Sequence, residues 1–146
     1  MKNLFVIFFF LLLTLSHSIT LAAKPPPPSA SAISGYIVDG DTFAAKVKLE
    51  EGAEVSVRVR ILHIDAPELK GECEKEIEWA NRSRNRLAEL LPEDSVIYLT
   101  EIKDDKYLGR IDASVKLADG RDIGEIMLRE NLARPYNGGK RQPWCD

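Results

Sequence analysis

Short apolar segments separated by turn residues constrain the fold of this chain more than any other feature. Every second residue from Val55 to Ile61 is valine or isoleucine within a predicted strand over 55–64, a pattern typical of a strand with one buried face. Two earlier apolar segments, 33–38 and 42–49, are set off by Asp-Gly-Asp and Glu-Glu-Gly. Because Asp and Gly readily adopt turn conformations, the sequence predicts a meander of three short strands.

The rest of the chain adds helices and two more strands. Residues 72–91 have apolar side chains at helical spacing, and Pro92 ends that pattern. Strands are predicted over 96–102 and 110–117, and a second helix over 123–130 after a capping box. This order predicts an α+β fold: an OB-fold-like five-stranded β-barrel with two to three helices.

The N-terminal region has a different character. Residues 1–23 combine Lys2, an unbroken apolar run and a small-residue end, as in a cleaved signal peptide. Four consecutive prolines make residues 24–32 a stiff linker, so the domain is expected over 33–146. We therefore expect an exported protein, periplasmic or secreted, with no stable membrane contact after cleavage.

The chain contains two cysteines, Cys73 and Cys145. An even pair in an exported protein usually forms a disulfide, and two free thiols are the alternative. A bond would hold the C-terminal tail, including Lys140 and Arg141, closer to the segment that follows the third strand.

Four carboxylates flank two turns that neighbouring strands can bring to one rim of the barrel: Asp39, Asp41, Asp65 and Glu68. A hard divalent cation with oxygen ligands would relieve their mutual repulsion. The alternative is that each acid serves only its own turn.

Two arginines, Arg60 and Arg110, lie on predicted strands near these acids. Guanidinium groups match phosphate oxygens, although each arginine could instead form a surface ion pair. The net charge of −3 provides no long-range attraction for a polyanion, so any polyanion must be bound locally.

Four segments, VDGDTF, RILHIDAPE, KYLGR and DGRDIGEIMLRENLA, together resemble the thermonuclease family of staphylococcal-nuclease-like domains. The resemblance covers Ile33 to Tyr136. It implies a Ca²⁺ site formed by Asp41, Asp65 and the backbone carbonyl of Ala66.

The same resemblance implies a catalytic Glu68 and two phosphate-binding arginines, Arg60 and Arg110. The family commonly has Tyr-Gly-Arg at the second arginine, whereas this chain has one extra residue, Leu108, after Tyr107. The sequence therefore leaves open whether Tyr107 contacts a substrate. Tyr136 in the tail is a second candidate for substrate contact, because aromatic faces stack on bases.

The expected function is that of a monomeric, calcium-dependent endonuclease that hydrolyses DNA and RNA with little sequence selectivity. An OB-type module that binds single-stranded nucleic acid without cutting it is the alternative. Such a module would not need the glutamate, both arginines and both metal-binding aspartates, and all five are present.

Overall fold

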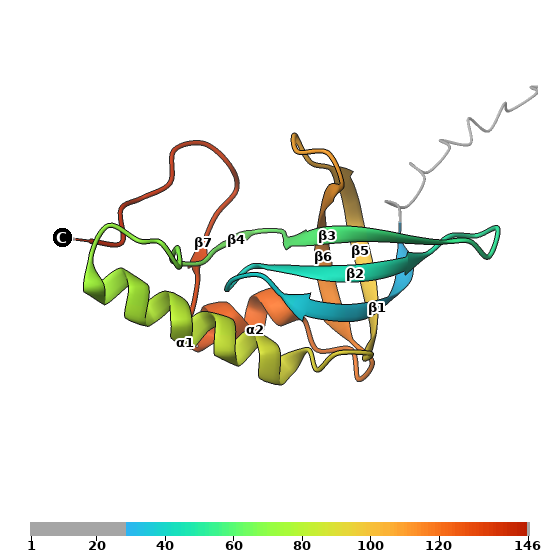
Figure 1. The fold of residues 1–146 in the computed structure, drawn as a ribbon, viewed down its shortest axis with the longest axis horizontal. Helices are drawn as coiled ribbons and strands as arrows, with labels where there is room; N and C mark the ends of the chain where they lie inside the picture. The colour runs from blue at the N-terminus through green and yellow to red at the C-terminus, as the bar shows by residue number, and fades with distance from the viewer. Residues whose placement is uncertain (1–28, 146) are drawn as a thin grey trace, which may run out of the picture.

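Five strands form a closed barrel in the computed structural model, which describes residues 29–145. Their order around the barrel is β1-β2-β3-β6-β5 (Figure 1). Only β3 and β6 pair in parallel; the other neighbours are antiparallel. The bounds are β1 Ala30–Ile37, β2 Thr42–Lys48, β3 Glu54–Ile61, β5 Val96–Asp104 and β6 Arg110–Leu117. This confirms the predicted α+β, OB-fold-like barrel.

Two helices accompany the barrel in the described residues: α1 Glu74–Leu90 and α2 Ile123–Arg129. Figure 1 shows them beside each other, with the C-terminal segment looping on the other side of the short strands β4 (Ile64–Asp65) and β7 (Arg134–Pro135). The predicted start of α2 is confirmed, because the side chain of Asp122 accepts a hydrogen bond from the N–H of Glu125. No helix in residues 29–145 is long and apolar enough to cross a membrane.

The core lies between the barrel wall and the helices. Barrel side chains such as Phe43, Val59 and Leu99 pack with Leu87 of α1 and Met127 of α2, and all five are fully buried. The apolar face predicted for β3 is buried only in its second half, and Val55 is exposed. The reason is that β6 pairs with β3 only from Arg58 to Ile61.

Two strand boundaries differ from the prediction by three residues each. β1 starts at Ala30 rather than at Ile33, because Ala30–Ile33 pair with Val96–Leu99 of β5. The last three residues assigned to the linker therefore belong to the barrel. The expected signal peptide, 1–23, and the first part of the linker lie outside the described residues.

The third predicted strand does not run on to Ile64. His63 has φ 66°, and the chain turns there. Ile64–Asp65 then form the short strand β4, which pairs with β7, Arg134–Pro135. This pairing places Asp65 beside the C-terminal segment.

The predicted disulfide between Cys73 and Cys145 is confirmed. Other contacts also hold the tail. The Trp144 ring packs edge-on against Trp79 with 5.0 Å between centroids. The Arg134 guanidinium lies over the Trp144 ring, 3.7 Å from its centroid. The same guanidinium donates a hydrogen bond to the carbonyl of Pro143.

Candidate active site

The Asp39–Asp41 turn lies directly against the segment that follows β4. Glycine is required at position 40, because a Cβ there would lie 2.7 Å from the Cβ atoms of both Ala66 and Ser83. The close approach lets the N–H of Ala66 donate to Oδ2 of Asp41 at 3.0 Å. Sequence-distant turns thus meet at one rim, as the sequence predicted.

Asp41 is buried, and burial raises the pKa of its carboxyl to about 6. Arg60 opposes this rise and the neighbouring Asp39 adds to it. Asp65 is buried as well. One nitrogen of the Arg60 guanidinium lies 3.4 Å from a carboxylate oxygen of Asp41 and 3.7 Å from one of Asp65, so the two carboxylates share one cation.

Glu68 stands at the edge of this group, and half of its side chain is exposed. Arg141 from the tail donates hydrogen bonds to both Glu68 and Asp65. The sequence reasoning missed this contact with the site carboxylates. The signal for it was the position of Arg141 only four residues before Cys145, whose bond to Cys73 returns the tail to this rim.

Arg110 opens β6 and is held by Asp105, to which it donates two hydrogen bonds of 2.9 and 3.2 Å. Burial opposes ionisation of Asp105, but the hydrogen bonds from Arg110 and from the Tyr107 N–H keep the pKa of this carboxyl below its usual value. Asp112 interacts with Asp105, and its pKa is raised by burial and by Asp105. Its Oδ1 has no hydrogen-bond partner in residues 29–145.

The extra residue before Arg110 is accommodated in the exposed loop at the rim of the site. Leu108 is fully exposed, and Gly109 has φ 75°, which glycine adopts without strain. The Tyr107 ring centroid then lies 4.4 Å from the Arg110 guanidinium. The additional residue therefore does not turn Tyr107 away from the second arginine.

A cleft of about 780 Å³ brings most of these side chains together. The predicted site residues on its wall are Asp41, Arg60, Glu68, Tyr107, Arg110 and Tyr136. The Tyr136 ring centroid lies 5.7 Å from the Arg60 guanidinium. Asp65 lines an adjoining hollow instead, and Ala66 is buried.

Arg58 also lines the cleft and was missed as a site residue. It pairs with Arg110 in the parallel register of β3 and β6. The signal was the alternation in β3, which places Arg58 and Arg60 on the face opposite the buried Val59 and Ile61.

The donor set fits a calcium ion. Asp41 and Asp65 offer carboxylate oxygens that are buried and already share a cationic partner, and hard oxygen donors are what Ca²⁺ binds. Ala66 contacts Asp41 through its N–H, so a role for its carbonyl stays a prediction.

Comparison with known proteins places this chain in a family. No similar protein was found among the curated proteins. Residues 58–143, which carry Arg60, Asp65, Glu68 and Arg110, match the model of the staphylococcal nuclease homologue family. The match begins after the Asp39–Asp41 turn, whose place in the site rests on the contacts described above. Since the matched residues are more than half of the chain, this protein belongs to the staphylococcal nuclease homologue family.

Proposed function

We propose that the protein is a calcium-dependent endonuclease that hydrolyses phosphodiester bonds of DNA and RNA with little sequence selectivity. One observation carries this proposal: Arg60, Arg110 and Glu68 line the same cleft as the buried carboxylate of Asp41. Two cations and a carboxylate around one hollow suit a phosphodiester, which needs charge neutralisation and a base.

The arginines would bind and neutralise the phosphate. Asp105 occupies two donor positions of Arg110, and a guanidinium has five N–H donors. The remaining donors of Arg110 would be available for phosphate oxygens. Arg60 would act from the opposite strand of the β3–β6 pair, and both would stabilise charge that builds up on the phosphoryl oxygens.

Glu68 would act as general base toward an attacking water. Its Oε1 accepts a hydrogen bond from Arg141, so Oε2 would be the oxygen that takes the proton. Asp41 and Asp65 would hold the ion, which when bound would supply positive charge next to the phosphate. The aromatic faces of Tyr107 and Tyr136 would stack on bases without reading sequence.

We further propose that the protein is exported to the periplasm or secreted and acts as a monomer without stable membrane contact. The Cys73–Cys145 disulfide supports export, because disulfides persist in oxidising compartments and are rare in reducing ones. Mass measurement of the mature N-terminus tests cleavage near residue 23, and light scattering tests the monomer.

The test of activity is incubation of the purified protein with supercoiled plasmid and with a structured RNA. We expect cleavage with Ca²⁺, much less with Mg²⁺, which demands stricter octahedral geometry, and none with excess chelator. Arg110→Ala should abolish cleavage. Arg121→Ala is the matched control, because Arg121 is exposed and pairs with Asp119 outside the cleft.

Binding of either nucleic acid without cleavage would contradict the proposal and favour a binding module. Full turnover in excess chelator would overturn the calcium assignment alone.

A further inference from the structure

The loop that carries Glu68 is tied to a buried carboxylate on α1. Glu76 is only 5% exposed, although it lies in the first turn of a helix. One of its oxygens accepts the N–H of Glu68 at 3.2 Å, and the other accepts the N–H of Glu72 at 2.9 Å. A single side chain therefore fixes the backbone at Glu68 and at the end of the loop.

Capping of the helix explains only part of this arrangement. α1 begins after Cys73, whose side chain makes no capping hydrogen bond among the described residues. Glu76 is the third helical residue, the position from which a capping-box glutamate reaches back to the N-cap N–H. Here it reaches beyond the N-cap to Glu72 and to Glu68, eight residues before it. The bond to Glu68 serves the loop rather than the helix.

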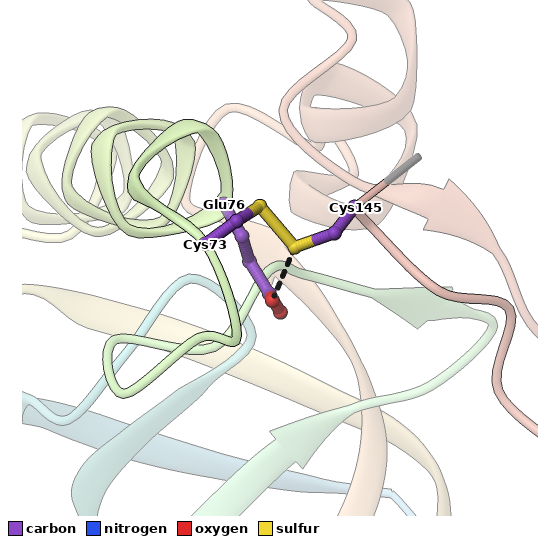
Figure 2. Close-up of side chains that lie close together, drawn as sticks. All are labelled: Cys73, Glu76 and Cys145. Atoms are coloured by element: carbon purple, nitrogen blue, oxygen red, sulfur yellow. Dashed lines mark hydrogen bonds between the residues drawn. A yellow bond between two sulfur atoms is a disulfide. The ribbon is translucent and has the colours of Figure 1, made fainter.

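The surroundings of Glu76 leave its carboxylate little freedom. A Cβ on Gly71 would lie 2.6 Å from Cγ and Cδ of Glu76, so only glycine fits there without displacing the side chain. On the other side, Sγ of Cys145 lies 3.6 Å from the oxygen that accepts the Glu72 N–H (Figure 2). The sulfur of a disulfide carries no proton, so this is a packing contact rather than a donated hydrogen bond.

A metal site is not the explanation for this cluster. The ligand atoms of Cys73, Glu76 and Cys145 lie within 4.8 Å of one another. The two sulfurs, however, are bonded to each other, and a metal binds thiolates. Both carboxylate oxygens of Glu76 are also engaged by backbone donors.

We infer that Glu76 is a positioning residue for Glu68: its buried carboxylate holds the backbone from which the base reaches into the cleft. The inference rests on the proposed nuclease function. Misplacement of a reacting group by about 1 Å can lower a rate by about 10²-fold, so the restraint bears on turnover. The Cys73–Cys145 bond packs against this restraint and forms part of its support.

Two substitutions test the inference without altering a residue of the cleft. Glu76→Gln keeps the shape but replaces one acceptor oxygen with an N–H₂ donor, which faces a backbone N–H. Gly71→Ala keeps the charge but displaces the carboxylate. Glu78→Gln is the matched control, because it removes an exposed carboxylate from the same helix.

We expect kcat on plasmid DNA to fall roughly 10- to 10²-fold in both variants. We expect KM and the affinity for Ca²⁺ to stay within about twofold, because the arginines and Asp41 are untouched. Hydrogen exchange of the Glu68 amide, followed by NMR, should accelerate in both variants and stay unchanged in Glu78→Gln. This second measurement does not depend on activity.

A folded Glu76→Gln or Gly71→Ala variant with wild-type kcat, or with unchanged exchange at Glu68, would overturn the inference and leave Glu76 as a helix cap. If the wild-type protein cuts no nucleic acid, the proposed function fails instead. That result is distinguishable, because the exchange measurement still reports whether Glu76 holds the loop.

Discussion

Removal of the Cys73–Cys145 disulfide should strongly destabilise the domain. The bond joins residues 72 positions apart in the sequence. Loss of a cross-link over such a loop raises the entropy of the unfolded chain, and this effect is worth about 4 kcal/mol at 25 °C. For a domain of this size, 1 kcal/mol shifts Tm by roughly 3–6 °C. We therefore expect Tm to fall by roughly 12–24 °C.

The folded tail has other anchors, since Trp144 packs against Trp79 and Arg134. These contacts do not replace the stabilisation that the disulfide provides, because the disulfide acts by restricting the entropy of the unfolded chain. They should instead keep the reduced protein native below its new Tm. Its kcat should then fall less than in Glu76→Gln, because Glu76 retains both backbone donors.

The assay is calorimetric melting of the protein with and without reductant, with the thiol state verified by alkylation and mass spectrometry. A Cys73→Ser/Cys145→Ser double variant provides the same comparison without reductant. If the fully reduced protein melts within about 3 °C of the oxidised one, the chain-entropy reasoning is wrong for this loop.

Four substitutions at the rim give further tests. Arg60→Lys keeps the charge but loses the planar fork, so kcat in plasmid cleavage should fall about 10²-fold; a near wild-type rate would reduce Arg60 to a surface charge. Glu68→Gln should lower kcat by about 10²–10⁴ while fluorescence anisotropy still detects DNA binding. Burial raises the pKa of Asp41 to about 6 in the folded state, above its value in the unfolded chain. Between about pH 4 and 6 the metal-free folded state therefore holds a proton that the unfolded chain has lost, so the free energy of unfolding falls as the pH rises. Asp41→Asn should remove that slope in thermal melts from pH 4 to 8 and raise Tm at pH 8; an unchanged slope would contradict the burial argument. Arg141→Gln removes a cation from Asp65 and Glu68, so calorimetry should show Ca²⁺ binding tightened roughly three- to tenfold, a modest gain because Arg141 is partly exposed. Unchanged affinity would show that Arg141 does not compete with the ion.

The sequence by itself predicted the barrel, because its strands and turns are specified by residues that are close together in the chain. Alternating apolar residues in β3 and turn residues at 39–41 specify strands and turns without reference to distant segments. The RILHIDAPE segment carries Arg60, Asp65 and Glu68 within nine residues, and its likeness to a known family was visible before any packing was known. Two cysteines were enough to predict one disulfide.

Tertiary structure alone decided which charges meet. Arg141 reaches Asp65 and Glu68 from 76 and 73 residues away, and no local periodicity encodes a contact at that separation. It depends on the break at His63, the β4–β7 pairing and the disulfide acting together. In the sequence, Glu76 is one of several acids at the start of the helix predicted over 72–91, where the helix dipole favours negative charge. Only the close packing of Gly71 and Cys145 around it shows a buried carboxylate whose two acceptor oxygens are used by the loop, because burial and hydrogen-bond partners arise when distant segments come together.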